Sequence, residues 1–343
     1  MARGRATLKD VAERVGVHLS TVSRVLNAKP GYAVSEEVAE KIRTAARELG
    51  YKTNPFAYSL RVNRSFTIGV LIPDLTNPVF PPIIRGIERT LAKKGYIAIL
   101  ADSDNDPAEE ERILERLKAR QTDGLILATA HRADELVADC LEEGYRVVLI
   151  NRSVEAAGVS SVTNDDHFGI AQAVRHLASL GHRHIAHVAG PQTISTGYQR
   201  YLAFREAMRA EGLAVDDNLI AFCDAFAEKE GRRAMAQILA RGKPLSAVVA
   251  ANDLLALGCY DALEAAGRRC PEEISVTGYN DMPFADKFKP PLTTVHIPLF
   301  EMGIEAAEAM LALLDADKSE PRQVRLKPEL VVRGSTARAP AGI

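Results

Sequence analysis

Long apolar runs are absent from this sequence of 343 residues. Runs such as Ile68–Ile72 and Val147–Ile150 fall far short of the ~20 residues that a helix needs to cross a bilayer. The N-terminal stretch is polar and basic, without the apolar segment of a secretory signal, so we expect a cytoplasmic protein with no membrane partner. Hydrophobic residues still make up 47% of the chain, which allows a substantial core and excludes a disordered protein.

Cysteines and catalytic motifs are scarce as well. The four cysteines lie far apart without a C-x-x-C pair, which indicates reduced thiols rather than a disulfide framework or a zinc site. The sequence has no G-x-G-x-x-G, P-loop, H-E-x-x-H or G-x-S-x-G motif. We therefore predict that the protein is not an enzyme and has no cofactor.

Two groups of potential metal ligands occur, but neither has the spacing of a metal site. His182 and His184 would share one face of a strand, and His187 would point to the other face. Aspartates alternate over residues 102–106, but the terminal glutamate of a calcium-binding EF-hand does not follow. We expect no bound metal.

Net charge is also nearly absent, because 43 basic and 45 acidic side chains leave −2. The average conceals an uneven distribution. Residues 1–65 hold twelve basic and six acidic side chains, a net charge of +6, whereas residues 66–343 carry −8. A small basic head on a large acidic body indicates an electrostatic partner for the head alone.

The basic head has the periodicity of three short helices. Apolar residues at helical spacing predict the first over 8–15, and Thr7 and Asp10 have capping-box spacing at its start. A second helix with a polar outer face is predicted over 19–26, and a third over 35–49. A helix, a glycine-containing turn and a second helix form a helix-turn-helix, whose second helix enters the DNA major groove. The alternative is a three-helix interaction module with a solvated basic face.

Three side chains of the second helix are candidates for reading bases. Arg24 can donate two hydrogen bonds to guanine, Leu19 can contact a thymine methyl group, and Ser20 lies near the helix start. Asn54 and Pro55 then begin another predicted helix of only about two turns, which is too short to be stable alone in water.

Beyond residue 65, apolar strands alternate with helices, which predicts a parallel, doubly wound α/β sheet. The alternation repeats from about Ile185, so we expect two similar lobes with a cleft between them. Ligands bind beyond the carboxyl ends of the strands in such sheets. The polar and aromatic residues at those ends suit a small polar molecule with apolar faces. They are Phe80, Asn151, Arg152, the segment Thr196–Arg200, Phe226, Asn252 with Asp253, and Asn280 with Asp281.

Several motifs together resemble the lactose-repressor (LacI/GalR) family of bacterial transcription regulators. They are T-L-K-D-V-A-E-R-V-G-V-H-L-S-T-V-S-R-V-L-N (7–27), A-x-S-L-R (57–61), I-G-V-L-I-P-D-L-T-N-P-V-F (68–80), G-H-R-H-I-A-H-V-A-G-P (181–191), A-N-D-L-L-A-L-G (251–258) and P-P-L-T-T-V (290–295). They span nearly the whole chain in the family's order. The resemblance implies a repressor whose affinity for a near-palindromic operator is controlled allosterically by a small-molecule effector.

The resemblance also implies an all-α helix-turn-helix domain over 1–53, a hinge helix and linker over 54–64, and a periplasmic-binding-protein-like effector and dimerisation domain over 65–343. Lobe one would take about 65–163 and 296–324, and lobe two about 164–293 and 325–340. In this family the leucine matching Leu60 wedges into a base step of the minor groove. The expected DNA contacts are Thr7, Leu19, Ser20, Thr21, Ser23, Arg24, Asn27, Tyr51, Asn54, Ala57 and Leu60. The resemblance also narrows the expected effector-binding residues to Phe80, Asn151, Arg152, Thr196, Arg200, Phe226, Asn252 and Asn280.

The sequence departs from the family pattern in two informative places. His18 stands where a serine cap of the recognition helix is usual. Asn151 and Asn280 stand where sugar-binding relatives usually carry aspartate, while Arg152 and Arg200 remain. Losing two carboxylates beside two arginines favours an anionic or weakly polar effector, such as a sugar acid or aromatic acid. Asparagines that bind the hydroxyl groups of a neutral sugar are the alternative.

The resemblance implies a homodimer whose interface lies along the body, and residues 333–343 lack the apolar heptads of a tetramerisation helix. Two other functional classes are less consistent with the sequence. A solute-binding protein of a transporter would have a signal peptide and no basic head, and a metabolic enzyme would carry a nucleophile, metal or nucleotide motif.

Overall fold

The computed structural model describes residues 6–26, 34–51, 64–155, 158–315 and 320–341. The chain divides into two compact units, Met1–Ser65 and Phe66–Ile343, and each is described by itself. No helix in these described ranges is both long and apolar enough to cross a membrane.

The first unit contains the three predicted helices, α1 (Leu8–Val15), α2 (Leu19–Leu26) and α3 (Glu36–Glu48). The capping box at the start of α1 is present: the Thr7 amide donates to the Asp10 carboxylate at 2.7 Å, and the Asp10 amide donates to the Thr7 hydroxyl. Apolar side chains from all three helices form the core of the unit, with Val11, Val22 and Ile42 fully buried.

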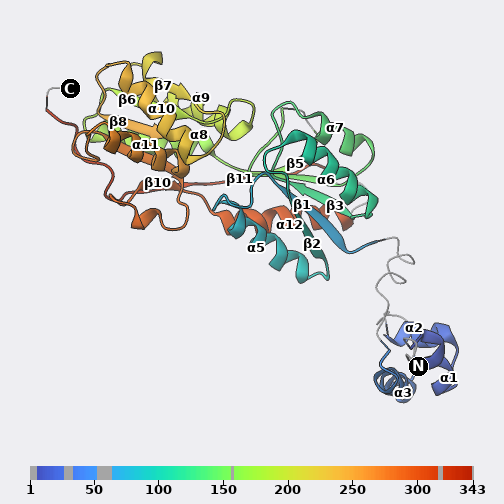
Figure 1. Ribbon diagram of the computed structural model, residues 1–343. Coiled ribbons are helices and arrows are strands. Elements are labelled where there is room, and N and C mark those ends of the chain that lie inside the picture. The colour runs from blue at the N-terminus through green and yellow to red at the C-terminus, as the bar shows by residue number, and fades with distance from the viewer. Residues whose placement is uncertain (1–5, 27–33, 52–63, 156–157, 316–319, 342–343) are drawn as a thin grey trace. The chain divides into compact units, whose positions relative to one another are not determined.

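The second unit is built on two six-stranded sheets, which confirms the predicted two-lobed α/β fold (Figure 1). The first sheet has the order β11-β5-β4-β3-β1-β2 and the second β12-β10-β9-β8-β6-β7. All neighbouring strands are parallel except β10 and β12. The strands are β1 (Thr67–Ile72), β2 (Ile97–Asp102), β3 (Gly124–Leu127), β4 (Val147–Ile150), β5 (Ser160–Asn164), β6 (Ile185–Ala189), β7 (Ile220–Phe222), β8 (Ala247–Ala250), β9 (Ser275–Asn280), β10 (Thr293–His296), β11 (Gln323–Leu326) and β12 (Glu329–Val331).

Helices cover both faces of each sheet and thereby bury the central strands along their whole length. The helices are α5 (Phe80–Ala92), α6 (Pro107–Ala119), α7 (Glu135–Glu142), α8 (Asp166–Ser179), α9 (Ser195–Ala210), α10 (Glu228–Ala240), α11 (Asp253–Ala265) and α12 (Leu299–Asp315), with short 3-10 turns at Asp217–Leu219 and Ala285–Lys287. Figure 1 shows α5 and α12 side by side. Glycines allow this close approach, since a Cβ at Gly86 would lie 2.2 Å from the Phe300 carbonyl oxygen.

The chain passes between the two sheets three times, after β5, after β10 and after β11. The first lobe, defined by the β1-containing sheet, therefore includes α12 and β11 from near the end of the chain. The second lobe, defined by the β6-containing sheet, includes α8 to α11. All three crossings can act as pivots between the lobes because each is only a few residues long.

Candidate functional site

The outer face of α2 presents the predicted base-reading side chains. Val22 anchors the helix in the core, while Leu19 on the other side is 44% exposed and Ser20 and Arg24 are half-buried. An exposed leucine at the start of a short helix suits contact with an apolar base edge. Thr21 and Ser23 lie on the same helix and are half-buried.

The other predicted DNA contacts fall in three different places. Thr7 caps α1, and Tyr51 packs against the core of the head, with its amide donating to the Ala46 carbonyl at 2.9 Å. Both therefore have structural roles whether or not they contact DNA. Four predicted contacts lie outside the described residues: Asn27, Asn54, Ala57 and Leu60.

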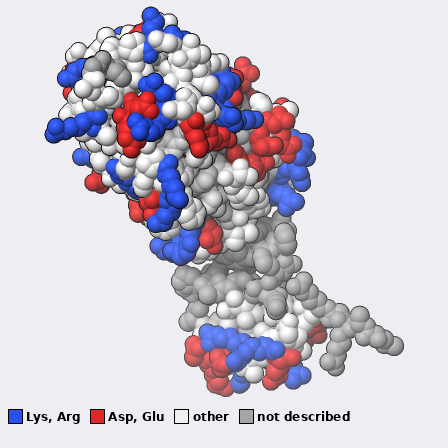
Figure 2. All heavy atoms as spheres, turned by 60° about the vertical axis from the view of Figure 1, so that its left-hand side comes forward, with Lys and Arg blue, Asp and Glu red and all other residues white. Residues whose placement is uncertain are grey.

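The ion pairs formed by the side chains of α1 and α3 balance in charge. They join Arg14 to Glu48, Lys9 to Glu13, Lys41 to Glu37, Arg43 to Glu36 and Glu40, and Arg47 to Glu40. Figure 2 shows one face of the head, where basic and acidic side chains lie next to one another. The +6 excess of the head therefore comes from residues elsewhere, including Arg24 on α2.

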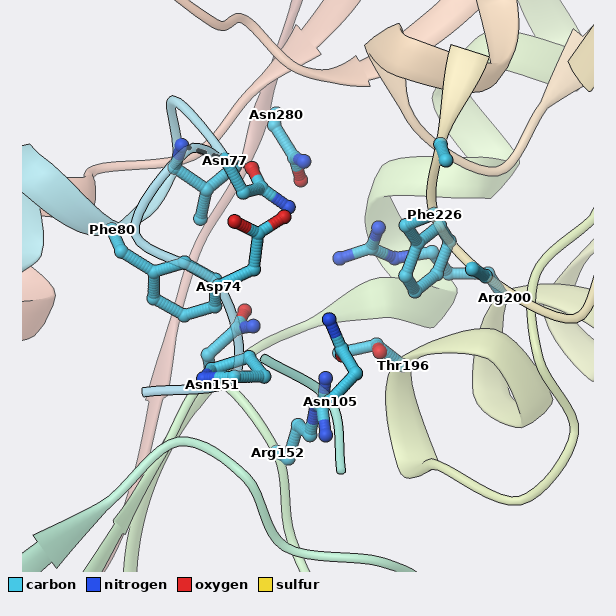
Figure 3. A pocket seen from close by; sticks show the side chains of 14 residues that line it. Asp74, Asn77, Phe80, Asn105, Asn151, Arg152, Thr196, Arg200, Phe226 and Asn280 are labelled. Atoms are coloured by element: carbon cyan, nitrogen blue, oxygen red, sulfur yellow. Dashed lines mark hydrogen bonds between the residues drawn. The ribbon is translucent and has the colours of Figure 1, made fainter. Parts of the chain in front are cut away.

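A cavity opens between the two lobes, at the carboxyl ends of the strands. It is lined by seven of the eight predicted ligand-binding residues: Phe80, Asn151, Arg152, Thr196, Arg200, Phe226 and Asn280. Figure 3 shows Phe80 and Asn151 approaching from one side and Arg200 and Phe226 from the other. Its volume of about 100 Å³ holds roughly seven to ten waters, which is the scale of one sugar ring.

Strained backbone aims two of these side chains. The Arg152 amide donates to the Ile150 carbonyl at 2.7 Å, which closes a tight turn around Asn151 at φ +64° directly after β4. Asn280 ends β9 at φ +113°. Asparagine tolerates positive φ better than most residues, so local geometry is one reason for the residue type at both positions.

Arg152 is a buried cation with few protein partners. Its side chain is enclosed, and one guanidinium nitrogen donates to the Thr129 carbonyl at 2.7 Å. Burial lowers the pKa of Arg152 to about 10, although the carboxylates of Glu110 and Asp134 partly offset this effect. No carboxylate in the described part of the chain forms an ion pair with it within 4 Å. An anionic ligand group would therefore gain a charged hydrogen bond here.

Arg200 is held by groups of its own lobe. Its Nε donates to Asp166 at 2.9 Å, another guanidinium nitrogen donates to the Ala251 carbonyl at 2.9 Å, and its plane lies 3.9 Å from the centre of the Tyr279 ring. Asp166 opens α8, directly after the first crossing between the lobes. Arg200 thus links the cavity to a crossing segment.

Three polar lining residues were missed from the sequence: Asp74, Asn77 and Asn105. Asp74 and Asn77 follow β1 and Asn105 follows β2, so the strand-end rule could have found them. In Figure 3 the Asp74 carboxylate points into the cavity. This carboxylate can accept hydrogen bonds from hydroxyl groups of a ligand. Asn151 and Asn280 carry amides and supply no carboxylate.

Asn252 is the predicted residue that does not line the cavity. It is 2% exposed, and its side-chain oxygen accepts the Leu255 amide at 2.9 Å as the N-cap of α11. Asn252 does follow the end of β8, as predicted, but its side chain caps α11.

A set of contacts beside the cavity joins the two lobes directly. In lobe one, Arg132 places its guanidinium 3.5 Å from the centre of the Tyr198 ring of lobe two. Its backbone amide donates to the Thr193 carbonyl at 3.0 Å, and its side chain donates to the Gln192 carbonyl at 3.2 Å.

A second point of contact lies nearby, where the Ser153 amide of lobe one donates to the Ser195 hydroxyl of lobe two at 2.9 Å. We call these contacts of Arg132 and Ser153 the cross-lobe clamp. They require the lobes to be close together.

Comparison with known proteins identifies the family to which this chain belongs. Residues 7–54 match the model of bacterial regulatory proteins of the lacI family, and residues 174–336 match a periplasmic binding protein-like domain. The HTH-type transcriptional regulator CelR of Thermobifida fusca is 35% identical over 340 residues, covering 97% of this chain and 99% of CelR. The chain belongs to the LacI family. Its recognition from sequence motifs is confirmed.

Solved structures of LacI-family members agree with this fold. A CelR–cellobiose complex is 34% identical, with a TM-score of 0.75, and covers 96% of this chain and 100% of its own. A lac repressor dimer bound to operator and the anti-inducer ONPF is 27% identical, with a TM-score of 0.84, and covers 97% of this chain and 99% of its own.

Proposed function

We propose that the protein is a sequence-specific transcriptional repressor, acting as a homodimer, whose affinity for a near-palindromic operator is set by a small molecule bound between its lobes. The observation that carries this proposal is that one LacI-family chain holds both a helix-turn-helix with an exposed recognition face and a polar cavity between two lobes. Two copies supply two recognition helices, one for each half-site. Residues 54–64 are proposed to connect the two functions as the hinge.

The coupling follows from the position of the cavity. Its lining comes from both lobes, so a ligand that contacts both favours one lobe arrangement over others. Arg200 connects that ligand to Asp166 at a crossing segment. By thermodynamic reciprocity, a ligand that alters operator affinity has its own affinity altered by the operator to the same extent.

The proposed effector class is a small polyhydroxylated molecule, a sugar or a sugar acid. Asp74 and the asparagines around the cavity can pair with hydroxyl groups, while Phe80 and Phe226 offer apolar faces to a ring. The buried Arg152, which lacks a carboxylate partner among the described residues, favours a carboxylate on the ligand. The cellobiose of the CelR complex represents the neutral-sugar alternative.

Matched ligand pairs distinguish these two possibilities. Calorimetric titration of the full-length protein with an aldose and with its uronic acid holds ring and hydroxyl groups constant and adds only the carboxylate. The acid is expected to bind more tightly to the wild type, and this advantage is expected to shrink in Arg152→Gln. Tight binding of the neutral sugar alone would refute the acidic effector and leave the repressor function intact.

A further inference from the structure

The histidine at the start of the recognition helix makes an unusual pair of contacts. His18 directly precedes α2, and its Nδ1 lies 3.2 Å from the backbone nitrogen of Ser20 and 2.8 Å from the Ser20 hydroxyl oxygen. A backbone N–H can only donate a hydrogen bond. In this geometry His18 Nδ1 therefore accepts, and the ring N–H is on Nε2.

This assignment fixes the direction of the second contact. With no hydrogen on His18 Nδ1, the hydrogen between that nitrogen and the Ser20 oxygen has to come from the serine. The single hydroxyl hydrogen of Ser20 is then directed toward the protein. Only the lone pairs of its oxygen remain for a partner outside, so Ser20 can accept from a base but cannot donate to one.

The direction of this hydrogen bond has consequences for base reading. In the major groove, adenine N6 and cytosine N4 are amino donors, whereas guanine O6 and thymine O4 are keto acceptors. We propose that His18 is a positioning residue that makes Ser20 select an amino-bearing base, adenine or cytosine, over a keto-bearing one at one position of each half-site. The inference rests on the proposed function, in which α2 reads DNA.

His18 can be changed without removing the start of the helix. Its backbone carbonyl accepts the Thr21 amide at 2.8 Å, and this bond does not involve the imidazole. A serine side chain at this position is a good N-cap. In His18→Ser the new hydroxyl caps the helix and Ser20 is free to rotate its own hydroxyl, so it can donate as well as accept.

The experiment is selection of binding sites from a random double-stranded DNA library by the full-length protein. Wild type is expected to enrich a near-palindrome with adenine or cytosine at one position per half-site, favoured over the keto bases by at least about fivefold. His18→Ser is expected to enrich the same palindrome with that one preference lost, and Ser20→Ala should lose it too. His184→Ser, which removes an exposed imidazole from the second unit, is the matched control and should select as wild type does.

The outcomes separate this inference from the proposed function. Failure of wild type to enrich any sequence would overturn the DNA-reading function itself. An enriched palindrome with guanine or thymine at the Ser20-dependent position would overturn the inference alone. So would unchanged selection by Ser20→Ala, or His18→Ser binding all sites more weakly with its base preferences intact, because a purely structural cap predicts that uniform loss.

Discussion

The cross-lobe clamp predicts that Arg132 stabilises the closed arrangement of the lobes in the absence of any ligand. Arg132→Ala removes the stacking on Tyr198 and the hydrogen bond to the Gln192 carbonyl, both of which require closed lobes. The ion pair with Glu155 lies within lobe one and does not depend on closure. The loss therefore falls selectively on the closed state.

The magnitude follows from the two lost contacts. A cation–π contact contributes about 0.5–2 kcal/mol and a hydrogen bond about 0.5–1.5 kcal/mol, and the Arg132 side chain is 28% exposed. Together they stabilise the closed state by about 1–3 kcal/mol, which is roughly a 5- to 150-fold change in the ratio of closed to open protein. An effector that binds only closed protein would lose affinity by up to the same factor.

Hydrogen exchange at the Ser153 amide measures the ratio of closed to open protein. This amide donates across the cleft to the Ser195 hydroxyl, so this bond breaks when the lobes separate. The Arg132 side chain forms its hydrogen bonds with Glu155 and Gln192 instead. Exchange at Ser153 in full-length Arg132→Ala should accelerate by roughly the same factor. Arg112→Ala is the matched control, since Arg112 pairs with Glu109 inside lobe one. Unchanged exchange at Ser153 in Arg132→Ala would refute the clamp.

Three further predictions concern the head and the core. Arg24→Ala should cost about 1–3 kcal/mol of operator binding and relax selection at one base, measured by titrating single-base operator variants. Operator affinity of wild type should fall steeply as salt rises, and a flat salt dependence would contradict phosphate contacts by the basic head. Burial lowers the pKa of His187 to about 4. As the pH falls, a histidine in the unfolded chain takes up its proton before His187 in the folded chain does. Urea unfolding should therefore show that wild type loses about 3 kcal/mol more stability than His187→Phe between pH 6.5 and pH 4.

Strand-end reasoning predicted most of the cavity because it depends only on local sequence and sheet topology. Parallel strands end at one edge, so Asn151, Arg152 and Asn280 converge wherever the helices pack. Asn252 also follows a strand, but its side chain caps the next helix, and position after a strand does not distinguish these two roles.

The contacts between the lobes could not be predicted from the sequence. Arg132 and Tyr198 lie in different lobes, and nothing in either local sequence specifies that they meet. The start of α9 at Ser195, which puts Thr196 on the helix, is likewise not marked in the local sequence. That helix begins without a side-chain cap, so the usual start signal is missing.

His18 could be recognised in the sequence as unusual, but its effect on Ser20 could not be predicted from the sequence. The departure from a serine cap was visible in the motif. Its consequence depends on where Nδ1 lies relative to the amide and hydroxyl of Ser20, and this geometry is specified only by the folded turn before α2.

The most direct test of the account is the operator affinity of the full-length protein with and without a ligand that calorimetry has shown to bind the cavity. Fluorescence anisotropy with the selected palindrome gives both dissociation constants. The account predicts that saturating ligand changes operator affinity by roughly 5- to 150-fold. It also predicts that Arg200→Ala, which breaks the link from the cavity to Asp166, reduces that change while ligand-free operator binding persists. Equal operator affinity with the cavity empty and occupied would contradict control of the head by the cleft.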